Sequence, residues 1–209
     1  MLAKSLAVSA IVGASILAVA AVQNVASKPE DAKPIGVGKM VPKVNLTSLE
    51  GKSTSLESII NNKTTVLIFY RGGWCPFCMR HLKDLGSITG DLKEMGAQIV
   101  AISPDKPEDL KASIDKNELA YKLFSDSSAE AMKAFGVAFR LDDETFGMYK
   151  ERFNIDLERS SGQNHHILPV PSVYVVNGKG KIKFAHNDPN YRVRLEADKV
   201  LAAAKSASQ

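Results

Sequence analysis

The chain has 209 residues, of which 44% are hydrophobic and 24% charged, so its composition is that of a folded globular protein and excludes a disordered one. This length predicts a single domain. The formal charge of +4 comes from interleaved basic and acidic residues without a long basic run, so we expect no nucleic-acid partner.

The first 22 residues differ in composition from the rest of the chain. Lys4 precedes an apolar run that reaches Ala-x-Ala at 18–20, which is the pattern of a secretory signal peptide. An uncleaved membrane anchor is the alternative, because the apolar residues 5–22 approach the length of a membrane span. Both interpretations predict an exported protein in an oxidising, periplasmic or extracytoplasmic compartment, and the second adds a membrane tether. Residues 23–38 read as a polar linker and 39–206 as the folded domain.

Beyond the linker, segments typical of strands and helices alternate. Apolar and β-branched runs predict strands at 44–48, 65–70, 98–103, 122–125 and 172–176. Amphipathic spacing predicts helices at 55–60, 76–95, 108–116, 128–135, 144–153 and 191–205. Residues 177–180 predict a hairpin turn followed by a return strand at 181–185, and 160–166 predict a loop that could border a site. The alternation indicates an α/β fold with a mostly parallel sheet, helices on both faces and a late hairpin.

Both cysteines of the chain lie where an apolar strand gives way to a helix, at the C-x-x-C spacing of Cys75 and Cys78. Gly72 and Gly73 permit a sharp turn before them, and Pro76 suits the first turn of a helix. The start of a helix offers unpaired N–H groups and the positive end of the dipole, which favour a thiolate there. Because the thiolate is the reactive form, this context predicts a redox-active dithiol.

Other roles fit the cysteine pair less well. A structural disulfide across so short a loop would remove little entropy from the unfolded chain. A zinc site needs about four ligands and the chain has no second C-x-x-C, so no metal is expected. A soft-metal site that adds His81 with His165 or His166 remains the alternative. Otherwise we expect His81 to be an exposed helix residue, and the adjacent histidines to be loop residues.

Segment 69–78 (Phe-Tyr-Arg-Gly-Gly-Trp-Cys-Pro-Phe-Cys), supported by 51–56, 100–105, 134–137 and 168–176, resembles the thioredoxin superfamily. Within it, the chain resembles the peroxiredoxin-like branch of the alkyl hydroperoxide reductase/thiol-specific antioxidant (AhpC/TSA) family, over about residues 38–204. The resemblance implies a thioredoxin-like fold: a central mixed sheet flanked by helices, with a late β-hairpin and a C-terminal helix.

The site departs from the peroxiredoxin pattern Phe-Tyr-Pro-x-x-x-Thr-x-x-Cys. On that pattern Cys78 takes the peroxidatic position, while Cys75 replaces the threonine and Arg71 the proline. Pro171 stands where the family has an arginine before the hairpin strand. Thioredoxins have a cis-proline there, so the resemblance predicts a cis bond before Pro171, with an ordinary trans proline as the alternative.

Several residues are expected to support the two sulfurs. Arg71 either supplies positive charge that favours a thiolate or is a surface residue that caps the turn. Trp74 is expected to cover the pair and to offer an apolar contact surface, with an ordinary core tryptophan as the alternative. Pro76 and Pro171 shape the site as parts of the resembled motifs. Arg140 is a candidate replacement for the missing family arginine.

The resemblance implies an antioxidant oxidoreductase that cycles through a Cys75–Cys78 disulfide. In a peroxidase, one thiolate becomes a sulfenic acid and the other thiol condenses with it. In disulfide exchange, Cys75 is the exposed nucleophile and Cys78 resolves the mixed disulfide. Both mechanisms require an external thiol reductant, expected to be a thioredoxin-like electron donor, and no further cofactor.

Two alternatives accompany this expectation. The full-length resemblance favours a hydroperoxide substrate, whereas the local replacements favour an extracytoplasmic oxidoreductase that acts only on protein disulfides. Outside enzymes, the histidines and the exported address would suit a copper-binding protein of the Sco type.

Overall fold

The structure is a computed structural model that describes residues 25–208. The predicted signal peptide or anchor at 1–22 therefore lies outside the described residues. Within 25–208, no helix combines the length and the apolar character needed to cross a membrane.

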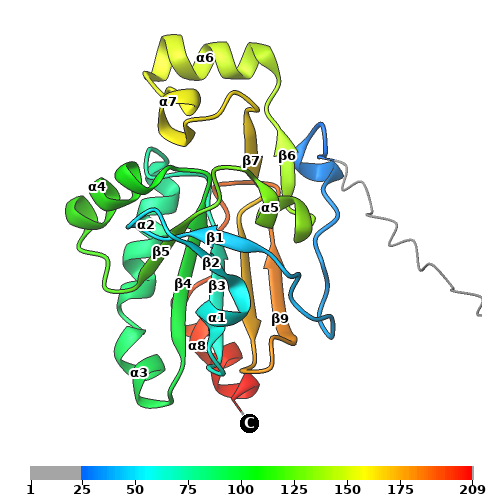
Figure 1. Ribbon diagram of the computed structural model, residues 1–209, viewed down its shortest axis with the longest axis vertical. Helices are drawn as coiled ribbons and strands as arrows, with labels where there is room; N and C mark the ends of the chain where they lie inside the picture. Colours follow the sequence, from blue (N-terminus) through cyan, green and yellow to red (C-terminus); the bar gives the residue numbers. More distant parts are fainter. Residues whose placement is uncertain (1–24, 209) are drawn as a thin grey trace, which may run out of the picture.

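A seven-stranded mixed sheet forms the centre of the domain, with the strand order β2-β1-β5-β4-β3-β8-β9 (Figure 1). Its strands are β1 (Asn45–Thr47), β2 (Ser53–Ser55), β3 (Thr65–Phe69), β4 (Gln98–Ser103), β5 (Lys122–Ser125), β8 (Ser172–Val176) and β9 (Ile182–Asn187). Among these described strands only β3–β4 and β4–β5 pair in parallel. The mixed sheet is confirmed, but it is less parallel than the alternation of elements indicates because antiparallel hairpins form both of its outer sides.

Helices cover both faces of this sheet. One face packs against α2 (Pro76–Gly86), α3 (Thr89–Glu94), α4 (Pro107–Asn117) and α8 (Ala197–Ala207); the other packs against α1 (Leu56–Ile60) and α5 (Glu130–Ala134). Alternate residues of β3 divide between the two cores, with Leu67 and Phe69 on the α1 side and Val66 and Ile68 on the α2 side. The strand that leads to the cysteines is therefore buried on both faces, as its unbroken apolar run predicts.

The single helix predicted at 76–95 is wrong, because the segment forms two helices. α2 ends at Gly86, where the Ser87 hydroxyl donates to the Asp84 carbonyl at 2.7 Å, and Ile88 leaves helical geometry with φ −99° and ψ 2°. Leu85 and Leu92 lie on either side of this break and stay buried in the same core. Apolar spacing thus predicts which residues are buried but not where the helix is interrupted.

The upper part of the domain also differs from the prediction. The loop expected at 160–166 overlaps α7 (Leu157–Ser161), whose start is capped by the Asp156 side chain accepting from the Arg159 N–H. α7 follows α6 (Asp143–Phe153), and both lie beyond the strand ends, above β6 (Ala138–Arg140) and β7 (Ile167–Pro169) (Figure 1). These two strands form a separate antiparallel pair. Three-residue strands are too short to show a period in the sequence.

The described part of the predicted linker, residues 25–38, lies against the domain instead of extending free of it. The Ala26 N–H donates to the Ala138 carbonyl at 3.1 Å, and the Arg140 N–H donates to the Ala26 carbonyl at 2.8 Å. Figure 1 shows this segment beside β6, including the short 3₁₀ helix η1 (Pro29–Asp31). The start of this segment therefore lies alongside β6 and is joined to it by backbone hydrogen bonds.

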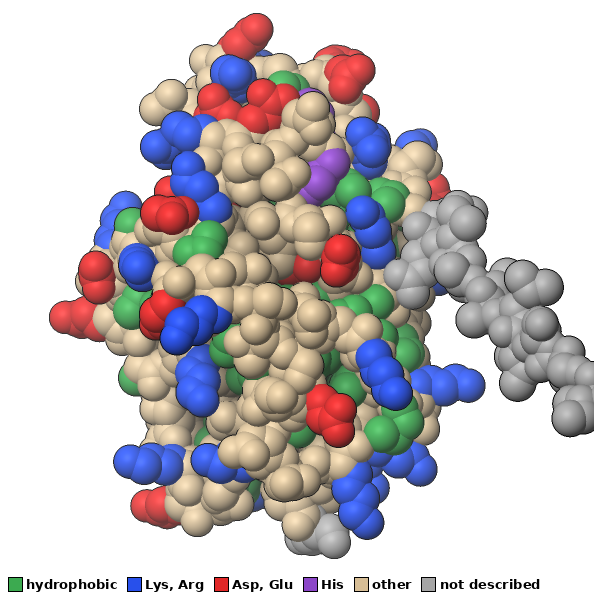
Figure 2. Space-filling view, viewed as in Figure 1, with side chains coloured by type: hydrophobic (Ala, Val, Ile, Leu, Met, Phe, Trp, Pro, Cys, Tyr) green, Lys and Arg blue, Asp and Glu red, His purple; other side chains and the backbone are tan. Residues whose placement is uncertain are grey.

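Charged side chains of both signs are interspersed over the face shown in Figure 2. This face has no extended patch of one sign, in line with the interleaved charges of the sequence.

Candidate active site

A tight turn between β3 and α2 places both cysteines at the start of the helix. Gly72 has φ +145°, and a Cβ at this position would collide with the Trp74 ring, so the turn requires glycine. Cys75 is the N-cap of α2, Pro76 occupies its first turn, and Cys78 follows within that turn. The predicted strand, C-x-x-C and helix arrangement is therefore confirmed.

The two sulfurs face each other as free thiols. The Cys78 thiol donates to Cys75 Sγ, and the two sulfur atoms lie 2.7 Å apart. Each cysteine is only 1% exposed, so the expectation of an exposed Cys75 is wrong. Trp74, Phe77 and Met79 pack against the core that contains the pair.

The surroundings of the two thiols shift their pKa values in opposite directions. The hydrogen bond from Cys78, its backbone N–H and the charges of Arg71 and Arg194 lower the pKa of Cys75 to about 6, although burial opposes this shift. Burial, the hydrogen bond to Cys75 and the negative charge there raise the pKa of Cys78 well above its ordinary value. At neutral pH, Cys75 is therefore the thiolate and Cys78 is the thiol that donates to it.

Arg194 lies at the thiol pair, although no motif or period of the sequence points to it. Its Nη2 lies 3.4 Å from Cys78 Sγ as a donor. It belongs to the loop at 188–196. The helix predicted at 191–205 is wrong in its first part, because α8 begins only at Ala197. Arg140, the residue proposed to replace the family arginine, lies exposed on β6 instead. Positive charge at the sulfurs thus comes from a loop segment that the apolar periodicity predicts to be helical.

His81 is buried, at 7% exposed, and the expectation of an exposed helix residue is wrong. Its Nε2 lies 3.0 Å from the Leu195 carbonyl, next to Arg194. Burial is the main reason that the pKa of His81 falls to about 4, so the ring is neutral and Nε2–H donates this bond. His81 therefore anchors the loop that brings Arg194 to the cysteines.

Arg71 extends from the turn into a group of aromatic rings. Its Nη2 donates to the Tyr149 hydroxyl, and its guanidinium carbon lies 4.2 Å from the Tyr191 ring centroid and 5.0 Å from that of Trp74. The side chain is 4% exposed. Its charge is among the causes that lower the pKa of Cys75, as predicted, although the hydrogen bond from Cys78 is the larger cause.

Asp105 supports the turn through a hydrogen bond to its backbone, although no motif of the sequence includes this residue. Its Oδ2 accepts the Gly73 N–H at 2.7 Å, and its other oxygen has no partner among the described residues. Burial raises the pKa of Asp105 to about 7, against the hydrogen bond from Gly73. The available signal was its place just after β4, because acidic residues at the carboxyl ends of parallel strands lie near the site of an α/β sheet.

The sequence profile of the AhpC/TSA family matches residues 37–185. The chain belongs to the AhpC/TSA family. Peroxiredoxin Bcp of Escherichia coli is 30% identical over 104 residues, which cover 50% of this chain and 66% of that protein. The thiol-disulfide oxidoreductase ResA of Halalkalibacterium halodurans is 29% identical over 93 residues, which cover 44% of this chain and 52% of that protein. The Bcp-type and mycobacterial peroxiredoxin relatives are matched over 62% to 66% of their length.

Solved structures support the fold. The crystal structure of peroxidoxin BcpB from Mycobacterium tuberculosis superimposes with a TM-score of 0.63 at 19% identity, covering 82% of this chain and 97% of that one. The predicted family and thioredoxin-like fold are both confirmed.

Pro171 departs from the prediction for this AhpC/TSA chain. No peptide bond within residues 25–208 is cis, so the cis bond expected before Pro171 is wrong. Trans is the lower-energy form, and the neighbouring backbone is satisfied in it. The Val170 N–H donates to the Val137 carbonyl, and the Ser172 hydroxyl donates to the Val170 carbonyl, both at 2.8 Å. Pro171 and Arg71 line the same cavity.

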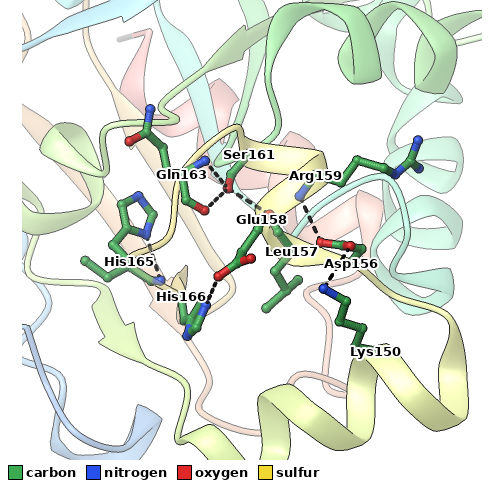
Figure 3. Close-up of polar contacts among 10 residues, drawn as sticks. Lys150, Asp156, Leu157, Glu158, Arg159, Ser161, Gln163, His165 and His166 are labelled. Carbon is green, nitrogen blue, oxygen red and sulfur yellow. Dashed lines mark hydrogen bonds and ion pairs between the residues drawn. The ribbon is translucent and has the colours of Figure 1, made fainter.

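His165 and His166 take part in the α7–β7 connection of this family member (Figure 3). His166 Nε2 lies 2.8 Å from Glu158 Oε1, and its ring stacks on Phe146 with centroids 3.8 Å apart. His165 Nε2 lies 2.8 Å from the Ser127 carbonyl. In the part of the chain that the structure describes, no group of three or more His, Cys, Asp or Glu side chains could hold a metal. The Sco-type alternative thus lacks a ligand set among these residues.

Proposed function

We propose that the protein is a thiol peroxidase that reduces hydroperoxides with Cys75 and Cys78. The observation that carries this proposal is the Cys78 thiol donating to the low-pKa Cys75 sulfur, 2.7 Å away, at the start of α2. The family membership and the peroxiredoxin relatives support it. Family resemblance alone would make Cys78 the attacking sulfur, whereas the electrostatics of this pair favour Cys75.

In the first step, the Cys75 thiolate attacks the terminal oxygen of the hydroperoxide and the O–O bond breaks. Cys75 is oxidised to a sulfenic acid, and the departing alkoxide takes the Cys78 proton and leaves as an alcohol, or as water when the substrate is hydrogen peroxide. The Arg194 guanidinium, 3.4 Å from Cys78 Sγ, stabilises the Cys78 thiolate that remains. Its charge offsets part of the burial effect that opposes ionisation of Cys78.

In the second step, the Cys78 thiolate attacks the Cys75 sulfur, the S–O bond breaks, and hydroxide takes a proton from solvent to leave as water. The product is the Cys75–Cys78 disulfide. An external dithiol, which we take to be a thioredoxin-like protein, returns two electrons to the pair by thiol–disulfide exchange; of its two protons, one goes to Cys78 and the other to solvent. No other cofactor enters this cycle.

Disulfide exchange with a protein substrate is the second candidate, and the ResA relative favours it. The 1% exposure of both cysteines favours a peroxide instead, because a small molecule reaches a covered sulfur with less movement than a protein disulfide requires. The test is to mix reduced protein with hydrogen peroxide, or separately with oxidised insulin, and follow formation of the intramolecular disulfide. Faster oxidation by insulin than by peroxide would reverse the order of the two candidates.

The attacking sulfur is identified by single variants and a sulfenic-acid trap. Cys78→Ser should accumulate a dimedone adduct at Cys75 after one equivalent of peroxide, whereas Cys75→Ser should react no faster than free cysteine. An adduct at Cys78 in Cys75→Ser, formed at the wild-type rate, would assign the attack to Cys78. Slow oxidation of every form would reject the peroxidase.

We also propose that the enzyme acts outside the cytoplasm, because residues 1–22 have the pattern of a signal peptide or anchor. Cell fractionation with N-terminal sequencing tests this. An extracytoplasmic chain that begins near residue 21 would indicate cleavage, and a full-length chain in the membrane fraction would indicate a tether. A full-length cytoplasmic protein would overturn the proposal.

A further inference from the structure

The Arg71 guanidinium is buried without a carboxylate partner. It is 4% exposed, its Nε has no hydrogen-bond partner, and none of the ion pairs among residues 25–208 includes it. Burying an unpaired cation costs free energy. The Tyr149 hydroxyl, which accepts from Nη2, and the faces of Tyr191, Tyr149 and Trp74 offset part of this cost, but none of these groups carries a negative charge. Among the described residues, the Arg71 side chain therefore has no anionic acceptor.

Arg71 also lines a cavity of about 220 Å³ beside the turn that presents Cys75. Pro171, Tyr149 and Tyr191 form other parts of its wall, and the exposed side chains of Arg140 and Lys28 add positive charge. This volume is below the range of roughly 300–1,000 Å³ that is typical of sites for drug-sized ligands. The cavity therefore suits a small molecule, or one end of a longer molecule.

One acidic residue, Asp142, also lines the cavity, but its carboxylate already has partners. Asp142 caps α6, with Oδ1 accepting the Thr145 N–H at 2.7 Å and Oδ2 accepting the Thr145 hydroxyl at 2.8 Å. Neither Arg71 nor Arg140 pairs with it within 4.0 Å among the described residues. The cavity thus combines aromatic walls with positive charge that no carboxylate of these residues neutralises.

We propose that this cavity binds the carboxylate of a small organic molecule. Arg71 receives the carboxylate, Arg140 adds attraction at the rim, and the Tyr149 and Tyr191 rings contact the apolar part. Arg71 belongs to the turn that presents Cys75, so the bound molecule contacts this turn, although neither cysteine lines the cavity. It is either a carboxylate-bearing hydroperoxide or a carboxylate-bearing thiol reductant. This assignment of its role, but not the binding itself, rests on the proposed peroxidase function.

Binding can be measured on the reduced full chain through Trp74, the only tryptophan of the protein. Trp74 contacts Arg71 and lies edge-on to Tyr149, with ring centroids 5.9 Å apart. Titration with hexanoate should change the tryptophan emission and saturate, whereas hexanol at equal concentrations should give no saturable change. Equal responses to both compounds, or no response to hexanoate, would overturn the proposal whether or not the protein proves to be a peroxidase.

Variants locate the bound carboxylate. Arg71→Gln should weaken hexanoate binding by more than about tenfold, because a charge-assisted contact is lost. Arg140→Gln should weaken it by about two- to fivefold, as for an exposed charge, and it keeps the proposal testable if the buried variant fails to fold. Arg80→Gln is the matched control, since Arg80 is exposed on α2 and does not line the cavity. Equal weakening by Arg80→Gln and Arg140→Gln would indicate nonspecific attraction and overturn the site.

Kinetics distinguish the two sources of the carboxylate. One pair of substrates is a carboxylate-bearing alkyl hydroperoxide and tert-butyl hydroperoxide; the other is 3-mercaptopropionate and 2-mercaptoethanol as reductants. Arg140→Gln should lower the kcat/KM preference for the carboxylated member of one pair, which identifies the ligand as substrate or reductant. An unchanged preference in both pairs, with peroxidase activity present, would overturn the assigned role.

Discussion

The Asp105 carboxylate accepts the Gly73 N–H at 2.7 Å and so ties the end of β4 to the turn that presents Cys75. This bond joins the segments that follow two neighbouring parallel strands, β3 and β4. The loop before α8 makes two further contacts with this region: Arg194 donates to Cys78 Sγ, and the Leu195 carbonyl accepts from His81. The thiol pair is thus positioned by contacts to the turn that precedes it and to the helix that follows.

The raised pKa of Asp105, about 7, makes stability depend on pH. A carboxyl whose pKa is higher in the folded than in the unfolded state destabilises the fold as pH rises between the two values, here from about 4 to 7. Asp105→Asn keeps an oxygen for Gly73 and removes this ionisation. We expect its free energy of unfolding to exceed that of the wild type at pH 8, by on the order of 1–3 kcal/mol, and the gain to vanish near pH 4.

Urea unfolding at several pH values measures this effect, and Asp126→Asn is the matched control. Burial raises the pKa of Asp126 to about 7 as well, but its carboxylate accepts the Ala131 and Met132 N–H groups at the start of α5. Both variants should change the pH dependence of stability, and only Asp105→Asn should change the oxidation rate of the thiols. Equal stabilities of wild type and Asp105→Asn at all pH values would contradict the first expectation.

The second prediction concerns the thiolate. The hydrogen bond from Cys78 is the largest cause of the lowered pKa of Cys75, so Cys78→Ala should raise that pKa from about 6 toward its ordinary value. Ultraviolet absorbance of the thiolate against pH measures the shift in the reduced protein. In Cys75→Ala, burial should keep the remaining Cys78 protonated at neutral pH. A midpoint unchanged by Cys78→Ala would show that the helix terminus and the arginines suffice.

The strands beside the site could be predicted from the sequence almost residue by residue. β4, β5 and β8 have the predicted bounds, and β3 ends one residue early, because each is a continuous run of apolar or β-branched residues. The C-x-x-C and its helix could be placed for the same reason, since a buried strand followed by glycines and a proline leaves few alternatives.

The contacts that complete the site could not be predicted in this way. Arg194 and Cys78 are 116 residues apart, and no local period relates them. His81 looked exposed because helical spacing does not reveal that a loop preceding α8 covers that part of α2. The final apolar stretch predicts a helix from 191, so the sequence gives no sign of the loop that carries Arg194. Tertiary packing decided each of these features.

The third prediction tests the role of His81 as an anchor. Its pKa of about 4 lies below that of an unfolded histidine, about 6.5, so the unfolded state binds the proton first and stability falls as pH drops through this window. His81→Gln retains a donor for the Leu195 carbonyl and does not titrate, so it should lose less stability than the wild type between pH 6.5 and 4. His81→Leu lacks the donor and should also slow closure of the Cys75–Cys78 disulfide. Wild-type closure in His81→Leu would show that the loop needs no anchor.

The last prediction concerns Arg194. Its guanidinium is the described cation that donates to a thiol sulfur, so Arg194→Gln should raise the pKa of Cys75. It should also disfavour the Cys78 thiolate, which attacks the sulfenic acid in the proposed cycle. We expect disulfide formation to slow by about tenfold, the change that corresponds to roughly 1.4 kcal/mol in the barrier. Rapid mixing with peroxide separates this step from sulfenic-acid formation. Arg192→Gln is the control, because Arg192 lies in the same loop but over the Tyr191 ring, 4.7 Å from its centroid. Equal slowing in both variants would mean that the loop contributes only a diffuse positive field, and that the hydrogen bond to Cys78 has no specific role.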